Sequence, residues 1–122
     1  MTVEEIIIDY LTENSITGIG EHVYAEKPVD QEDAYILIRR TGGSERDYIR
    51  SYLMITEVCV RRDEGNGLTK LYAADIFEEL LRKMQSITGT TALYGCHKNS
   101  DYDATDPDSK EYRYQALWEV TM

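Results

Sequence analysis

The chain has 122 residues, enough for a single domain spanning 1–122, and 23 acidic residues against 13 basic ones give it a formal charge of −10. This acidity argues against a nucleic-acid-binding protein, because lysine and arginine contacts with phosphates supply most of the affinity in that class. Two cysteines are too few for a disulfide framework, which is typical of a reducing compartment. No apolar run approaches the roughly 20 residues of a membrane helix, and the acidic start is unlike a signal peptide. We therefore expect a soluble intracellular protein without a membrane segment.

The first half of the chain predicts one helix and three strands. Thr2 and Glu5 fit a capping box, and apolar residues at helical spacing follow them, so a helix is expected to begin after Thr2. Gly42 and Gly43 predict the end of the second strand and the start of a polar arm over residues 41–51. The three strands are expected at 22–25, 34–40 and 52–62. In the third strand, alternation places Met54 and Val58 on one face and Glu57 and Cys59 on the other.

The second half predicts one long helix and two strands. Apolar residues recur every four positions from Leu68 to Met84, so residues 68–86 are expected to form an amphipathic helix. Strands are expected at 92–99 and 111–121, and in the latter the even positions from Tyr112 to Val120 share one face. The element order αβββαββ favours an α+β fold, with an antiparallel sheet of four to five strands and both helices on one face.

Two hairpin connections of about ten residues are expected, which exceed the usual two to five residues. Connections of that length tend to be functional. Tyrosines are concentrated in or beside them, and two interpretations stay open: they cover the sheet, or they line contacts between subunits. The residues concerned are Tyr48, Tyr52, Tyr102, Tyr112 and Tyr114.

No pattern in the chain predicts a catalytic or cofactor site. Cys96 and His97 are adjacent on a predicted strand, so their side chains point to opposite faces and cannot form a nucleophile–base pair. Cys59 is interpreted as a small buried hydrophobe, and a bridge to Cys96, although possible across neighbouring strands, is not expected inside a cell. The glycines at 42–43 and 65–67 lack phosphate-loop spacing and are typical of turns. The sequence predicts a protein that is not an enzyme.

An acidic loop at 99–108 is the one candidate for a metal site. An EF-hand register that begins at Asp101 places Asp103 and Thr105 correctly, but it puts Asp106 where the turn requires glycine and Tyr112 where the bidentate glutamate belongs. The register therefore fails. A looser site of oxygen ligands stays open beside the simpler interpretation of a solvated hairpin tip.

Three segments resemble tail terminator, or tail completion, proteins of long-tailed bacteriophages. Residues 35–44 (YILIRRTGGS) are similar to the second strand and arm of that family. Residues 99–103 and 112–121 are similar to its closing segment. The opening helix and residues 23–26 before Pro28 fit as well, so the resemblance spans essentially the whole chain.

The resemblance implies a non-enzymatic structural protein of a phage or prophage virion. Such proteins assemble in the host cytoplasm as a ring, typically a hexamer, on the last ring of the major tail tube protein. They end tube growth and provide the surface that docks to head–tail connector proteins at the tail–head junction. No catalytic, cofactor or metal residues follow from it. The alternatives are another neck protein, such as a connector or adaptor, and a small ligand- or calcium-binding module.

A ring gives the acidity a mechanical interpretation, because six copies would carry a charge of −60. An acidic channel repels phosphates, so DNA would pass through without specific binding. The alternative is that the charge only keeps the protein in solution. The candidate channel residues are Asp30, Glu32, Asp33, Asp101, Asp103, Asp106 and Asp108. The candidate subunit-contact residues, at the tip of the arm, are Arg46, Asp47, Tyr48 and Arg50.

Overall fold

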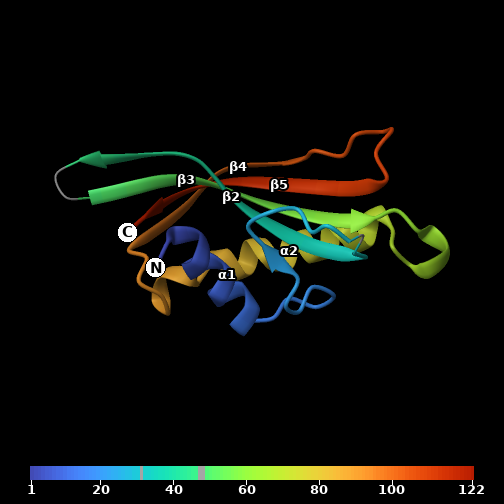
Figure 1. Ribbon diagram of the computed structural model, residues 1–122, viewed down its shortest axis with the longest axis horizontal. Helices are drawn as coiled ribbons and strands as arrows, with labels where there is room; N and C mark the ends of the chain where they lie inside the picture. Colours follow the sequence, from blue (N-terminus) through green and yellow to red (C-terminus); the bar gives the residue numbers. More distant parts are fainter. Residues whose placement is uncertain (31, 47–48) are drawn as a thin grey trace.

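Five strands form one sheet in the order β1-β2-β3-β5-β4, and both helices pack on one face of it (Figure 1). The computed structural model describes residues 1–30, 32–46 and 49–122. The predicted α+β class and the order αβββαββ are confirmed. The elements are α1 (Val3–Glu13), β1 (Val23–Tyr24), β2 (Ala34–Arg46), β3 (Ile49–Arg61), η1 (Glu64–Asn66), α2 (Lys70–Gln85), η2 (Ile87–Gly89), β4 (Gly95–Asp103) and β5 (Glu111–Thr121).

The core lies between the two helices and the even-numbered residues of β2, β3 and β5. Met54 and Val58 on β3 and Ala116 on β5 have no exposed surface, as the two-residue period of a strand predicts. Trp118 is also buried, and its indole N–H donates a hydrogen bond of 2.9 Å to the hydroxyl of Thr56. The face assignments made from the sequence are therefore confirmed.

Both helices begin at threonines whose side chains cap them. The side chain of Thr2 accepts a hydrogen bond from the backbone N–H of Glu5, whose carboxylate accepts one in return, which is the predicted capping box. Thr69 caps α2 in the same position, so α2 begins two residues later than the apolar spacing suggested.

The sheet is mixed rather than wholly antiparallel. β1 pairs in parallel with β2, with Val23 opposite Ile36, whereas all the other strand pairs are antiparallel. The segment between β1 and β2 is long enough to return the chain to the end of the sheet where β1 began. Only two residues pair, so the sequence pattern carries little sign of this strand's direction.

The prediction of a ten-residue loop after β2 is wrong, because β2 and β3 continue as a paired hairpin as far as Arg46 and Ile49. The ladder passes Thr41 with a bulge, and Gly42 and Gly43 then pair with Leu53 and Tyr52. A Cβ at position 43 would lie 3.0 Å from the carbonyl oxygen of Ser51. The glycine therefore permits a close approach of the two strands and does not end one of them.

The fourth strand lies three to four residues further along than predicted, from Gly95 to Asp103. A second bulge, between Lys98 and Ser100, keeps it paired with β5 through the polar residues that resembled a loop. Leu93, expected in the strand, instead buries its side chain in the core just before β4. The connection to β5 is accordingly shorter, at residues 104–110.

The two cysteines are free thiols on opposite faces of the sheet. Cys59 is completely buried beside Tyr35 and Leu37, on the face without helices. Cys96 packs against the helix-side core. The idea that a bridge between them is geometrically possible is wrong, because β5 separates their strands and the side chains point apart.

Candidate functional site

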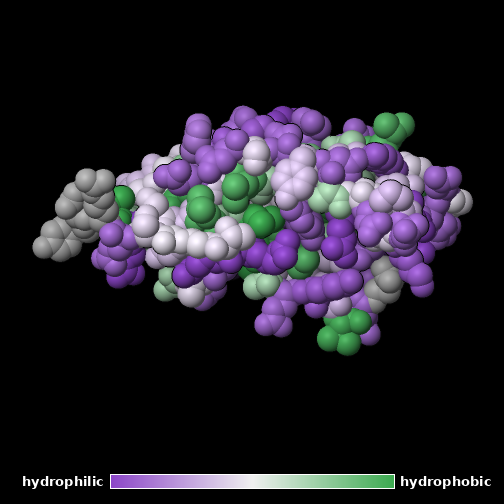
Figure 2. Space-filling view, turned by 90° about the horizontal axis from the view of Figure 1, so that it is seen from above, coloured by the Kyte–Doolittle hydropathy of each residue, from purple (hydrophilic) through white to green (hydrophobic). Residues whose placement is uncertain are grey.

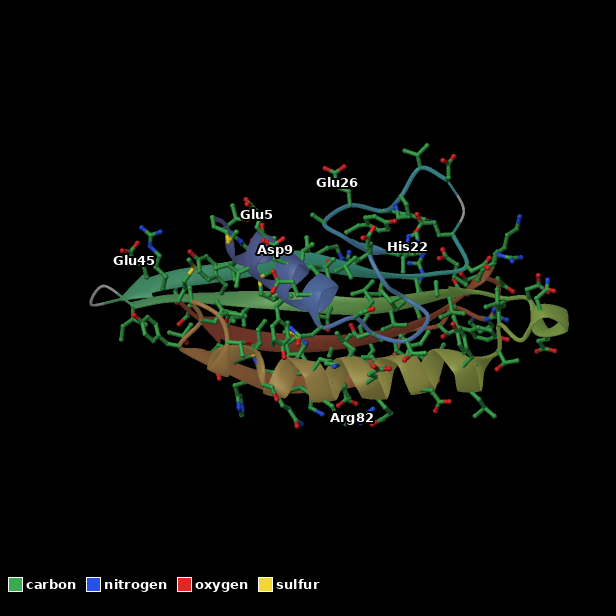
Figure 3. The ribbon with its side chains drawn as sticks, turned by 90° about the horizontal axis from the view of Figure 1, so that it is seen from below. Glu5, Asp9, His22, Glu26, Glu45 and Arg82 are labelled. Carbon is green, nitrogen blue, oxygen red and sulfur yellow. The ribbon has the colours of Figure 1, made fainter. Side chains whose placement is uncertain are left out.

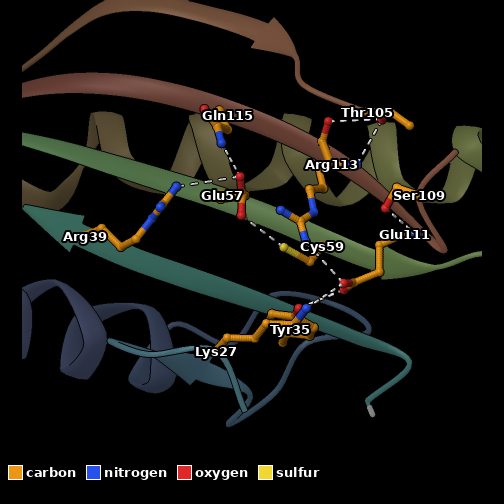
Figure 4. Close-up of polar contacts among 10 residues, drawn as sticks. All are labelled: Lys27, Tyr35, Arg39, Glu57, Cys59, Thr105, Ser109, Glu111, Arg113 and Gln115. Carbon is orange, nitrogen blue, oxygen red and sulfur yellow. Dashed lines mark hydrogen bonds and ion pairs between the residues drawn. The ribbon is translucent and has the colours of Figure 1, made fainter. Parts of the chain in front are cut away.

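The face of the sheet opposite the helices, here called the helix-free face, is apolar at its centre and polar around it (Figure 2). Leu53 is 36% exposed there, and Ile55 and Leu117 are half-buried. One-sided solvation is typical of antiparallel sheets. Towards the end of the sheet where β2 and β5 begin, this face carries two carboxylates that are almost fully buried, Glu57 and Glu111 (Figure 4).

Glu57 lies in β3 and is surrounded by donors from its own strand and from both neighbouring strands. The side-chain amide of Gln115 and the thiol of Cys59 both donate hydrogen bonds to its carboxylate. The guanidinium of Arg39 lies 3.7 Å away, on β2. The charge is thus compensated where it is buried, as a buried carboxylate requires.

Glu111, the first residue of β5, is held by three different segments. The hydroxyl of Tyr35 donates a 2.7 Å hydrogen bond to it, and the guanidinium of Arg113 lies 3.4 Å away. Lys27, from the loop between β1 and β2, reaches over β2 to within 3.5 Å of the same carboxylate. The cluster thus connects the β1–β2 loop to β5.

The geometry of this cluster indicates a structural role. Burial and the neighbouring carboxylates raise the pKa of the Cys59 thiol, so no thiolate is available at neutral pH. Burial and the bond to Glu111 raise the pKa of the Tyr35 hydroxyl in the same way. Sequence reasoning missed this cluster, although strand alternation already placed Glu57 with Cys59 and Arg113 with Gln115 on the face away from the core.

Cys96 and His97 do not form a catalytic pair. Cys96 lies opposite Val120 on the core side, where burial raises the pKa of its thiol to about 11. His97 is exposed and lies opposite Glu119, on the other face. The expected opposite orientation of these neighbours is confirmed.

The outer part of the β2–β3 hairpin, residues 41–46 and 49–53, projects past the helices at one end of the molecule and is called the arm (Figure 1). Of the four residues expected at its tip, Asp47 and Tyr48 lie outside the described residues, and Arg46 is the last residue of β2. Arg50 is exposed, with its guanidinium 3.8 Å from the carboxylate of Glu45. Ile49 is 54% exposed. The arm therefore presents both an aliphatic and a cationic side chain to solvent.

Five candidate channel residues lie in two loops at the end of β3 opposite the arm: Asp30, Glu32 and Asp33 in the β1–β2 loop, and Asp106 and Asp108 in the β4–β5 loop. Asp101 and Asp103 lie in β4. Arg61, the last residue of β3, binds the carboxylate of Asp33 at 2.8 Å. The next residue, Arg62, donates a 3.0 Å hydrogen bond to the carbonyl oxygen of Asp106. The two loops, which are far apart in the chain, are thus each attached to the same end of β3. They lie in the half of the molecule away from the arm (Figure 1).

Several of these acidic side chains already have partners. Asp103 pairs with Lys70 at the start of α2, at 2.7 Å, and Asp101 pairs with Lys98. Glu32 accepts a hydrogen bond from Tyr24. The remaining candidates, Asp30, Asp106 and Asp108, are exposed.

The tyrosines of the two hairpins were expected either to cover the sheet or to line contacts between subunits. Tyr112 is buried and Tyr114 stacks on Phe77 of α2, so both cover the sheet. Tyr52 is half-buried beneath the guanidinium of Arg40, 4.6 Å from the ring centre. Tyr102 is 50% exposed on the helix-free face and remains available for a contact between subunits.

Within the described part of the chain, no three acidic, histidine or cysteine side chains gather in a way that could hold a metal ion. None of the helices in residues 1–30, 32–46 and 49–122 has the length and apolar character needed to cross a membrane. Comparison with known proteins finds no family model and no curated protein that matches the chain.

Proposed function

We propose that this protein is a non-enzymatic structural subunit that assembles into a ring, expected to be a hexamer, at the end of a phage tail tube. The ring would end growth of the tube and present a docking surface to the connector proteins of the head. The proposal starts from the resemblance of residues 35–44 and of the closing strands to tail terminator proteins.

The observation that carries the proposal is the arm. Its strands are paired from Gly42 opposite Leu53 out to Arg46 opposite Ile49, so it is a formed hairpin that extends beyond the core of its own domain. Pairing of β3 with β5 ends at Ser51, so only two strands continue beyond it. A two-stranded ribbon with an exposed isoleucine is marginally stable by itself in water, so a partner surface would stabilise it. In a ring each subunit offers one patch to a different patch on its neighbour, and a projecting arm suits such a contact.

The charge distribution supports the same proposal. The two acidic loops both lie at the end of the molecule opposite the arm, where Arg61 contacts one and Arg62 the other. Six such ends around an axis would surround it with carboxylates, which repel the phosphates of a passing duplex. The exposed side chains Asp30, Asp106 and Asp108 are the ones best suited to face such a channel.

Light scattering on the purified full chain tests ring formation directly. One copy has a mass of 14.1 kDa, and a hexamer has six times this mass. We expect the hexamer over a series of increasing protein concentrations and a ring with a central hole in negative-stain images. A chain that keeps the mass of a single copy at every concentration and is absent from the tail–head junction of particles contradicts the proposal.

Deletion of the gene in the parent phage distinguishes a tail terminator from other neck proteins. Loss of a terminator leaves tube growth without an end, so overlong tails without heads are expected. Tails of normal length beside DNA-filled heads would instead identify a head-side connector or adaptor.

A further inference from the structure

An open groove of about 650 Å³ lies between α1 and the segment that leads into β4. Its apolar wall includes Ile6, Tyr10 and Met122, and its rim includes Asp9 and Glu13 of α1. Its volume is within the range of sites that hold a ligand or an inserted side chain. Ile6 and Tyr10 also belong to the hydrophobic core, so this apolar wall is packed against the rest of the domain.

Two carboxylates, those of Asp9 and Glu13, line the groove. The helix α1 contains four carboxylates and no lysine or arginine: Glu4, Glu5, Asp9 and Glu13. Among the described residues that line the groove, none has a basic side chain. Figure 3 shows Glu5 and Asp9 on α1, on the helix side of the sheet, and Glu45 at the distant end of the arm. The fitting occupant is therefore a segment that combines an aliphatic side chain with positive charge.

The chain itself contains such a segment. Residues 39–50 contain four arginines and two carboxylates, which gives a net charge of +2 in a protein whose total is −10. Arg50 is 60% exposed in its side chain, and the adjacent Ile49 is 54% exposed. Within one molecule, Arg40 of β2 already binds Glu4 of α1 at 2.6 Å, so the acidic surface of this helix does accept an arginine from this hairpin.

We propose that the arm of one subunit docks into the α1 groove of the next. Ile49 contacts the apolar wall formed by Ile6 and Tyr10, and Arg50 faces Asp9 and Glu13. This inference rests on the proposed ring and names its contact. The arm and the groove are different surfaces of one chain, so each subunit uses both, and the contact repeats head to tail until the ring closes.

Two single-surface variants test the proposal. Ile49→Asp damages the arm and leaves the groove intact, whereas the double substitution Asp9→Lys, Glu13→Lys damages the groove and leaves the arm intact. Both variants are expected to be monomers by light scattering, with the circular dichroism spectrum and thermal melting of a folded domain. Val29→Asp is the matched control, because Val29 is a fully exposed aliphatic residue that belongs to neither surface, and it should assemble as the wild type does.

Mixing the two variants provides the decisive measurement. The intact arm of the groove variant can enter the intact groove of the arm variant once, and no further contact is possible. The mixture should therefore stop at a dimer, with twice the mass of a single copy. A mixture that stays monomeric, or that forms complete rings, overturns the proposed contact. The protein should carry no tag at either end, because Met1 and Met122 line the groove.

Charge reversal on both surfaces supplies a second, independent test. Arg50→Glu alone should weaken assembly, and its combination with Asp9→Lys and Glu13→Lys should restore part of it. Rings that persist in both single-surface variants would refute the arm–groove contact but leave the ring itself standing. Wild-type protein that forms no ring at all would refute the proposed function, so the two failures are distinguishable.

Discussion

The hydroxyl of Tyr35 on β2 donates a 2.7 Å hydrogen bond across β3 to the carboxylate of Glu111 on β5. The two residues are 76 positions apart in the chain and are 2% and 5% exposed. Their strands are not neighbours, so this bond crosses the sheet where backbone pairing cannot. Together with Lys27 it holds the β1–β2 loop over the end of the helix-free face.

Tyr35→Phe should therefore destabilise the fold without changing its shape. It removes a donor from a buried carboxylate, and hydrogen bonds to charged groups contribute about 1.5–3 kcal/mol. The free energy of unfolding in urea at pH 7 measures this loss. Tyr94→Phe is the matched control, because Tyr94 is 85% exposed, and it should change stability by less than about 0.5 kcal/mol. Equal stabilities for the two variants would contradict the assigned role of Tyr35.

The two thiols should react at very different rates in the native protein. Cys59 has no exposed surface and a raised pKa, so a disulfide reagent should modify it only when the domain unfolds. Cys96 is half-buried with a pKa of about 11 and should react slowly but measurably as the pH rises. Labelling followed by mass spectrometry of peptides checks the order. Modification of Cys59 at the same rate as Cys96 under native conditions would refute the burial argument.

The Cys59 thiol and the Tyr35 hydroxyl also contribute to the loss of stability at alkaline pH. Their pKa values are higher in the folded protein than in the unfolded chain, whose thiol and phenol titrate near 9 and 10. Their contribution is complete below those values and is lost as the pH rises above them. Urea unfolding between pH 8 and pH 11 should show this loss, with a shallower decline in Tyr35→Phe. Stability that stays constant over this range would contradict it.

Asp103 makes the free energy of unfolding fall more steeply as the pH is lowered. Hydrogen bonds from Lys70 and Thr105 lower the pKa of its carboxyl to about 2, below its unfolded value of 3.8. Its contribution is present above about pH 4 and is lost as the pH falls towards 2. Because the side chain is 35% exposed, solvent screening limits the pair to about 1 kcal/mol or less.

The measurement is urea unfolding between pH 5 and pH 2 for the wild type, Asp103→Asn and Lys70→Met. Both variants should show a shallower loss of stability over this interval than the wild type. An unchanged slope in Lys70→Met would show that the pair with Asp103 does not operate in solution.

Alanine substitutions at two glycines with positive φ distinguish the cost of backbone strain from the cost of a steric clash. Gly18, at φ +86°, lies so close to α2 that an added Cβ would be 2.2 Å from the Tyr72 hydroxyl oxygen. Gly20, at φ +57°, has nothing within 4 Å of that position. Gly20→Ala should cost about 1–2 kcal/mol for the left-handed conformation alone, and Gly18→Ala should cost more.

Thermal or urea unfolding of the two alanine variants gives the difference between them. In a Tyr72→Phe background the nearest atom at position 18 becomes a ring carbon at 3.2 Å, so the extra cost of Gly18→Ala should fall. If Gly18→Ala is no worse than Gly20→Ala, the contact with Tyr72 is not significant.

The channel proposal predicts which carboxylates can be reversed. Lysine at positions 30, 106 and 108 should leave the ring intact, because these side chains are exposed. The same substitutions should slow DNA ejection from particles. They should also create salt-dependent binding of duplex DNA. The control makes the same charge change on the outer side of α2, at Asp75, Glu78 and Glu79. Ejection rates that do not differ between the two sets of variants would contradict an acidic channel formed by these loops.

Local patterns predicted the elements whose signals lie within a few residues of each other. The capping box of α1 joins Thr2 to Glu5, and the buried face of β5 follows from strict alternation around Trp118. The sequence also placed Glu57 and Cys59 on the face opposite the core. It could not show that Glu57 is buried, because that depends on Arg39 and Gln115, which come from two other strands.

By itself, the sequence determined the class of fold, the helices and the side of the sheet that each strand residue faces, because hydrophobic periodicity and capping are properties of neighbouring residues. Tertiary structure alone decided the parallel pairing of β1, the continuation of β2 through Gly42 and Gly43, the bond between Tyr35 and Glu111, and the groove beside α1. Each of these depends on which distant segments pair or pack, and a strand's length is set by its partner as much as by its own residues.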